Sequence, residues 1–335
     1  MSGPSYTPAA APEDYDELSQ EWNETKGRWV RLRERTHGNL PLGIGGALLA
    51  AYLVIAIAAV LHFGSGLFVL AQNQTVGALT PPPGPSRAHP FGVMGTIGVD
   101  ILWALFQATP IDIALIGGSI LLAAGIGLFL GTFAALVGGP LDLAVTFCTD
   151  LLTSVPPFFF VMVLFLGLQP FLRAPTYVLV FGVLYALVLW PYHARPVRAR
   201  ALQVAGETYV EAARAAGGGT GRLLRRHVMP NSVFPVLAQL PVDVYNFMFV
   251  LTVFPFLGLF AGSLFAYLTP FPTTVYPEWG YLLASGVDYG WSPLSQIDYW
   301  WMYAFPALAI VLFGIAVALT CDGLERYLAG ARQVR

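Results

Sequence analysis

The sequence predicts an all-α membrane protein with six transmembrane helices and both termini in the cytosol. Three observations predict it. The chain has 335 residues, of which 56% are hydrophobic and 11% charged, whereas soluble domains carry about 25% charged residues. Six apolar runs reach the roughly 20 residues that a helix needs to cross a bilayer. The basic residues gather in the segments that such a topology places on one side.

Composition also excludes several classes of protein. The net charge is −2, which argues against a nucleic-acid binder. Cys148 and Cys321 are the two cysteines, and they form neither a CxxC motif nor a cluster with histidine, so no disulfide framework or metal site is predicted. The sequence has no GxxxxGK[ST] or HExxH pattern, so we expect no ATP hydrolysis by this chain and predict no catalytic or cofactor-binding residue.

Residues 1–39 are polar and of mixed charge, and we expect a cytosolic N-terminal segment that is disordered over its first dozen residues. No apolar core of the signal-peptide kind occurs near its start. Residues 16–35 have two interpretations of equal merit. They form an amphipathic helix on the lipid surface, or they are a solvated basic flank that only fixes the topology.

The predicted transmembrane domain covers residues 40–328, and residues 329–335 form a cytosolic tail. A proline within a spanning helix is tolerated where neighbouring groups satisfy the freed carbonyl, so Pro156-Pro157 is expected to kink the third span. The six expected spans are Leu42–Leu70, a helix inside Ile113–Leu141, Ala144–Leu172, Ala174–Tyr192, Val233–Phe265 and Tyr299–Thr320.

The basic residues give the orientation. With the N-terminus inside, only Arg87 and Arg173 of the 17 Lys and Arg residues fall in outer segments. The positive-inside rule favours this arrangement. Both termini and the loop Glu207–Asn231 are therefore predicted to be cytosolic.

Two outer loops stand out. Ala71–Gly98 is rich in proline and contains Asn73-Gln74-Thr75, which makes Asn73 a candidate glycosylation site. Ala266–Asp298 is rich in aromatic residues. Its aromatic side chains are expected to form an interfacial belt with a packed cap, and the alternative is a stacking surface for a substrate or an external delivery protein.

The loop Glu207–Asn231 is the most polar segment in the second half of the chain. We predict a short helix over residues 207–216, ended by the glycines 217–219. Its alanines are small enough to let another surface approach closely, and Glu211 and Arg214 give it charged edges. Glu207 and Glu211 share one helix face, and we expect salt bridging to Arg214 or solvation there. The helix is either a docking element for a soluble partner or an ordinary interfacial helix.

Acidic residues inside membrane spans are costly and usually functional. Asp150 lies near the cytosolic start of the third span, where water can reach it. Asp243 lies two or three turns into the fifth span. The alternative function is therefore an ion-coupled secondary transporter that uses Asp243.

The loop also resembles the signature of permease subunits of binding-protein-dependent ABC importers, in the dipeptide/oligopeptide/nickel group of the second-permease type. The resemblance covers roughly residues 89–327, and it departs from the group's pattern at Val93-Met94 and Val99. The matching segments are Glu211-Ala212-Ala213 with Gly217, Arg226–Asn231, His89–Gly92 with Gly98 and Asp100, Trp190–Arg198, Phe256–Leu259, Glu278–Gly280, Phe305-Pro306 and Gly323-Leu324.

The resemblance implies the type I permease fold of ABC importers, in the cell membrane, as half of a heterodimeric pathway. The implied partners are a second permease, two cytosolic ATPases that bind ATP and Mg²⁺, and an external solute-binding protein. The implied cargo is an oligopeptide or similar solute, with oligosaccharides and metal chelates as alternatives. The residues implied to couple to the ATPases are Glu207, Glu211, Ala212, Ala213, Arg214, Gly217 and Arg222.

Overall fold

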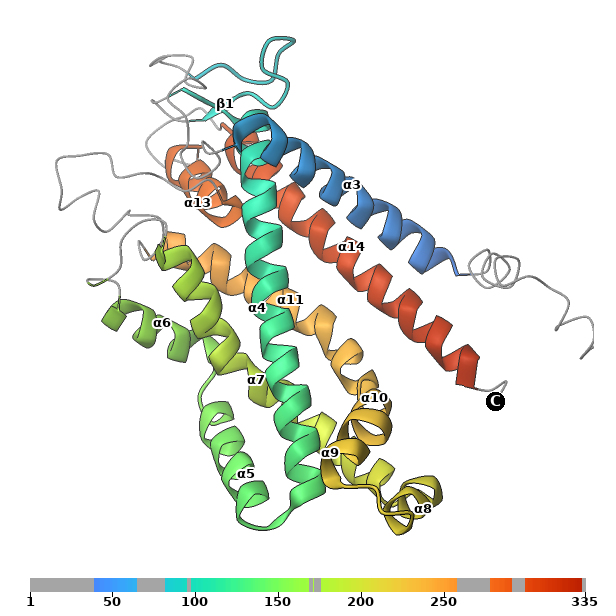
Figure 1. Ribbon diagram of the computed structural model, residues 1–335. Helices are drawn as coiled ribbons and strands as arrows, with labels where there is room; N and C mark the ends of the chain where they lie inside the picture. Colours follow the sequence, from blue (N-terminus) through green and yellow to red (C-terminus); the bar gives the residue numbers. More distant parts are fainter. Residues whose placement is uncertain are drawn as a thin grey trace, which may run out of the picture.

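The structure is a computed structural model that describes residues 39–64, 82–94, 98–168, 171, 176–257, 278–290 and 299–332. The N-terminal segment 1–38, Asn73, much of the aromatic outer loop and the last three residues lie outside this part of the chain. The described residues form a helical bundle around one long helix, α4 (Figure 1). The helices are α3 Leu40–Phe63, α4 Ile101–Val137, α5 Gly139–Thr153, α6 Pro157–Leu168, α7 Thr176–Ala205, α8 Thr208–Ala215, α9 Thr220–Leu223, the π-helical turn η4 Leu224–Val228, α10 Met229–Asn231, α11 Phe234–Phe256, α13 Trp279–Gly290 and α14 Trp301–Arg332.

Four of the described helices are long and apolar enough to cross a membrane, namely α3, α4, α11 and the Trp301–Tyr327 part of α14. The pair α5 and α6 makes a fifth span if it is counted as one. The prediction of a single kinked helix there is wrong, because the two helices bend by 87° at their junction. Pro156 and Pro157 lack the N–H groups that would continue the helix, and consecutive prolines leave two of its hydrogen bonds unmade.

Three other helices exceed their predicted bounds, among them α14, which runs to Arg332 and not to the predicted Thr320. α4 begins at Ile101 and continues through Pro110 and Asp112, so it is longer than the uncharged run from which the second span was predicted. α7 ends at Ala205, well beyond the predicted Tyr192, with Pro191 and Pro196 inside it. The basic residues Arg195, Arg198 and Arg200 therefore belong to α7 itself.

Glycines let two helix pairs pack closely. A Cβ atom on Gly127 of α4 would lie 2.4 Å from Cβ of His193 in α7, and one on Gly131 would lie 2.6 Å from the carbonyl oxygen of Ala194. Gly45 of α3 meets Thr320 of α14 in the same way. Small residues at such contacts allow the close backbone approach common between membrane helices. Figure 1 shows α3 and α14 running side by side.

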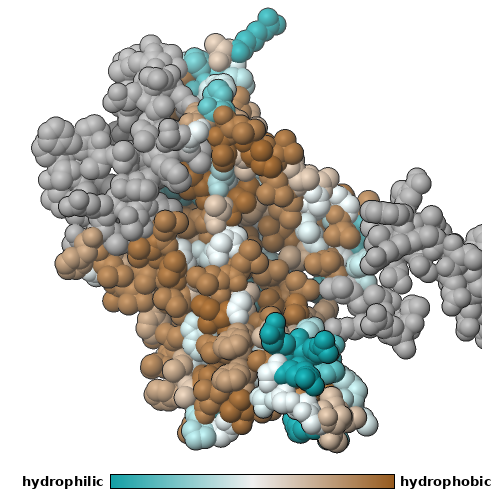
Figure 2. Space-filling view, in the orientation of Figure 1, coloured by the Kyte–Doolittle hydropathy of each residue, from teal (hydrophilic) through white to brown (hydrophobic). Residues whose placement is uncertain are grey.

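One end of the bundle carries a small hairpin. β1 (Val93–Met94) and β2 (Val99–Asp100) pair antiparallel. The hairpin is fastened to the start of α14, because Phe91 stacks on Phe305 at 4.2 Å and Trp301 Nε1 donates to the Val93 carbonyl at 3.2 Å. Hydrophobic residues dominate the visible surface between the two ends of the molecule (Figure 2), as expected for a surface that faces lipid.

Candidate functional site

The helix predicted in the polar loop is α8, which spans Thr208–Ala215 with Glu207 at its N-cap. The Glu207 carbonyl accepts hydrogen bonds from the N–H groups of Val210 and Glu211, at 2.9 and 3.1 Å. Glu207 has an extended backbone, and its side chain makes no capping hydrogen bond. The boundary between α7 and α8 is therefore set by the backbone at Glu207.

The end of α8 is a Schellman motif. Gly218 N–H donates to the Ala213 carbonyl and Gly217 N–H to the Arg214 carbonyl, both at 3.0 Å. This pattern needs a left-handed residue just past the helix, and Gly217 supplies it with φ of +83°. Gly218 belongs to the glycine run predicted to end the helix, and a Cβ atom there would lie 2.6 Å from the Ala213 oxygen. Two glycines therefore end the helix: Gly217 because its φ is positive, and Gly218 because a side chain would not fit there.

One side of α8 is anchored to the rest of the protein. Val210 is fully buried and Ala213 packs half-buried beside it. Their cluster is completed by Ala201, Val204, Leu223 and Val228, with Ala135 and Leu136 of α4 packed against it. Ala213 was predicted to matter by leaving room for a partner, but its side chain faces this internal cluster.

The opposite side of α8 is exposed. Glu211, Ala212, Arg214 and Ala215 are open to solvent, as is Arg222 in α9. In the described part of the chain no ion pair joins Glu211 to Arg214, so of the two expectations for these charges the structure shows solvation. Figure 2 shows hydrophilic surface where α8 to α10 lie at one corner of the molecule. The exposed face of α8 therefore consists of small side chains flanked by charges.

Asp243 is not an isolated acid. Its Oδ2 atom lies 2.9 Å from Nε2 of His193 in α7, and both side chains are fully buried. Gln239 donates from Nε2 to the Asp243 Oδ1 atom at 3.3 Å. The His193 and Asp243 side chains therefore meet at the contact between α7 and α11.

Asp150 is also paired. Arg195 of α7 contacts the Asp150 carboxylate and reaches the Thr153 hydroxyl at 3.3 Å. Closer to the start of α5, Arg198 binds both carboxylate oxygens of Asp142, with Nη2 to Oδ2 at 2.6 Å. Two arginines of α7 therefore hold α5 in place.

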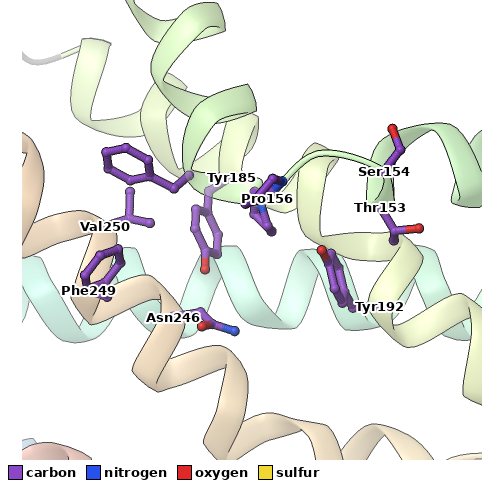
Figure 3. A pocket seen from close by; sticks show the side chains of 10 residues that line it. Thr153, Ser154, Pro156, Tyr185, Tyr192, Asn246, Phe249 and Val250 are labelled. Atoms are coloured by element: carbon purple, nitrogen blue, oxygen red, sulfur yellow. The ribbon is translucent and has the colours of Figure 1, made fainter.

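A cavity of about 480 Å³ lies where α5 meets α6, and α7 and α11 supply its other walls. Figure 3 shows Tyr185 and Tyr192 of α7 on one side and Asn246, Phe249 and Val250 of α11 on another. Thr153, Ser154 and Pro156 come from the break between α5 and α6. The 87° bend thus leaves room for the cavity.

Residues 127–331, more than half of the chain, match the family model of the binding-protein-dependent transport system inner membrane component. The chain belongs to this family. It is a multi-pass membrane permease subunit, and its relatives are transport subunits and not enzymes.

Several relatives of this permease are named as peptide transporters. It is 30% identical over 253 residues to the probable D,D-dipeptide transport system permease protein DdpC of Escherichia coli, covering 74% of this chain and 76% of the relative. It is 26% identical over 275 residues to the dipeptide transport system permease protein DppC of Haemophilus influenzae, covering 82% and 85%. The Bacillus subtilis protein of that name is 25% identical over 97% of both chains.

Two acids of the permease are buried close together, which the sequence analysis did not predict, although Glu278 lies in a segment that carries the resemblance. Asp112 of α4 accepts a hydrogen bond from Trp279 N–H at 2.9 Å, and the buried Glu278 accepts one from Gly280 N–H at 3.2 Å. Burial of the Glu278 carboxyl holds its pKa well above the usual range, and the Asp112 carboxylate adds to this shift. Asp112 was missed because the predicted span began one residue after it. Nothing local in the sequence links it to a residue more than 160 positions away.

Proposed function

We propose that this permease forms one half of the pathway of an ATP-driven peptide importer and that α8 is its coupling helix. The other half is a second permease subunit. Two cytosolic ATPases bind ATP and Mg²⁺ and press on α8, and an external binding protein delivers the cargo. In this proposal the chain has the type I permease fold, with six spans and both termini in the cytosol.

The exposed face of α8 is the observation that carries this proposal. Ala212 and Ala215 let a partner approach the helix backbone, while Glu211 and Arg214 at the edges can pair with charges of the partner. Glu207 and Arg222 border the same surface. On the buried side of α8, Val210 and Ala213 pack against residues of α7 and α4. A displacement of α8 is therefore transmitted to both helices through packed side chains.

The other functions considered gain less support. An ion-coupled transporter would need Asp243 to bind and release an ion, and its carboxylate is buried against His193. The names of the relatives favour peptides as cargo over oligosaccharides or metal chelates. Asp243 is assigned here to holding α7 against α11.

The test uses tryptophan substitutions on the two sides of α8. Ala212→Trp places a large side chain on the exposed face, so we expect the purified complex to lose its ATPase subunits and ATP-dependent peptide uptake while its melting temperature is unchanged. Ala213→Trp inserts the same side chain into the packed cluster, and overpacking of this kind costs about 1–3 kcal/mol. That variant should melt earlier.

Ala88→Trp is the matched control, because Ala88 is an exposed alanine at the opposite end of the molecule. It should keep the ATPase subunits bound. If the Ala212→Trp complex retains its ATPases and imports peptide at the wild-type rate, α8 is not the coupling helix.

A further inference from the structure

The cavity between the α5–α6 break, α7 and α11 has an unpaired polar group that points to a ligand. The Tyr185 side chain is fully buried, and its hydroxyl has no hydrogen-bond partner within the described chain. Leaving a buried hydroxyl unpaired costs roughly 1–3 kcal/mol. Figure 3 shows this hydroxyl turned toward Asn246 on the neighbouring wall. A ligand in the cavity could accept from Tyr185 and bond to the Asn246 amide together.

The break between α5 and α6 adds acceptors to the same cavity. Pro157 has no N–H, so it cannot donate to the carbonyl four residues earlier, at Thr153 of the lining. Thr153 and Ser154 bring hydroxyl groups to the lining. The Thr153 and Ser154 hydroxyls already donate to the carbonyls of Thr149 and Leu151, at 2.8 and 2.6 Å, so toward the cavity they act as acceptors. Together with the Tyr185 donor they suit the N–H and C=O groups of a peptide bond.

None of the ten residues that line the cavity carries a charge. The nearby charged groups already have partners, since Arg195 pairs with Asp150 and His193 with Asp243. Phe158 and Phe249, whose ring centroids lie 6.0 Å apart, form an aromatic wall. A free charge bound here would gain no counter-ion from the lining, whereas an apolar side chain can pack against the two rings.

We propose that this cavity is a binding site for an uncharged part of the cargo, a peptide bond flanked by an apolar side chain. The proposal rests on the function proposed above, since it assumes that the cargo is a peptide. Its volume of about 480 Å³ lies within the 300–1,000 Å³ common for small-molecule sites. Tyr185 and Asn246 hold the amide, and the two phenylalanines hold the side chain.

The test measures import in liposomes that contain the complete importer, with both permeases, the ATPases and the binding protein. The probes are three tripeptides with alanine at both ends and phenylalanine, lysine or glutamate in the centre. Tyr185→Phe removes only the hydroxyl group. We expect roughly three- to tenfold fewer phenylalanine peptides imported per ATP hydrolysed, with subunit assembly and the ATP hydrolysis rate unchanged.

Asn246 gives a second test that leaves the buried core intact, because its side chain is exposed. Asn246→Asp adds a negative charge to the lining, so the import ratio of the lysine peptide to the glutamate peptide should rise by about tenfold. The same binding protein serves every variant, so its own preference cancels from the comparison. Tyr245→Phe, an exposed position on α11 outside the lining, should change neither quantity.

The outcomes separate the two proposals. If the wild-type complex imports peptide while Tyr185→Phe and Asn246→Asp leave the yield per ATP and the ratio unchanged, the cavity does not hold the cargo. If the wild-type complex imports none of the three peptides, the function as a peptide importer is overturned, and this site with it.

Discussion

Nε2 of His193 lies 2.9 Å from Oδ2 of Asp243, and neither side chain is exposed to solvent. The pair joins α7 to α11, and His193 directly follows Tyr192 of the cavity lining. A buried pair of this kind contributes little net stability, but removing one partner leaves the other buried without compensation. Its expected role is to fix how the two helices meet.

The first prediction concerns this pair. Asp243→Asn or His193→Gln alone should destabilise the permease by about 3–5 kcal/mol, and the double variant should be more stable than the sum of the two losses predicts. Thermal unfolding in detergent measures all four proteins. Strictly additive losses would contradict the structural role. So would an Asp243→Asn variant that melts normally yet no longer imports, if wild-type import also stops when a proton gradient is collapsed.

The second prediction concerns the three glycines after α8. Gly217→Ala should cost about 1 kcal/mol because its φ is +83°, and Gly218→Ala should cost a similar amount because its Cβ would strike the Ala213 oxygen. Gly219 has φ of −66° and open space around its Cα, so Gly219→Ala is the control. Hydrogen exchange of the α8 amides reads out the effect, and equal exchange rates in all three variants would refute this account of the helix end.

The third prediction compares two arginines of α7. Arg198 binds Asp142 through two nitrogens and is two-thirds buried, whereas the Arg195 and Asp150 side chains are both about 60% exposed. Lysine cannot reproduce the bidentate geometry, and exposed pairs contribute about 0–1 kcal/mol. Arg198→Lys should therefore lower the melting temperature more than Arg195→Lys. The reverse order would show that exposure is the wrong criterion here.

The fourth prediction is a pH dependence. The pKa of Glu278 is raised above its ordinary value of 4.5 by burial and by Asp112. The folded protein therefore binds a proton that the unfolded chain releases, and stability falls as the pH rises from about 4.5 toward the raised pKa. Glu278→Gln should melt later at neutral pH and lose less stability between pH 5 and 8. Glu211→Gln, exposed on α8, is the control and should follow the wild type.

Much of the fold follows from hydropathy, because apolar runs, glycine breaks and arginine placement are local properties. The helix of the polar loop and its end at Gly217 were predicted correctly for that reason. Local patterns said nothing about the 87° break as a cavity wall, the contact of His193 with Asp243, or that of Asp112 with Trp279. Each depends on residues tens to hundreds of positions apart, and the side that Ala213 faces depends on the surrounding helices.

The helix α7 spans 30 residues, or about 45 Å at 1.5 Å per residue. Tyr185, which lines the cavity, lies nearer the first end of α7. At its other end, α7 stops two residues before α8 begins. Binding in the cavity and contact with α8 therefore both act on the same helix. If a cargo in the cavity favours one position of α7, any partner whose binding to α8 depends on that position is affected by an equal free energy, since linkage between two sites is reciprocal.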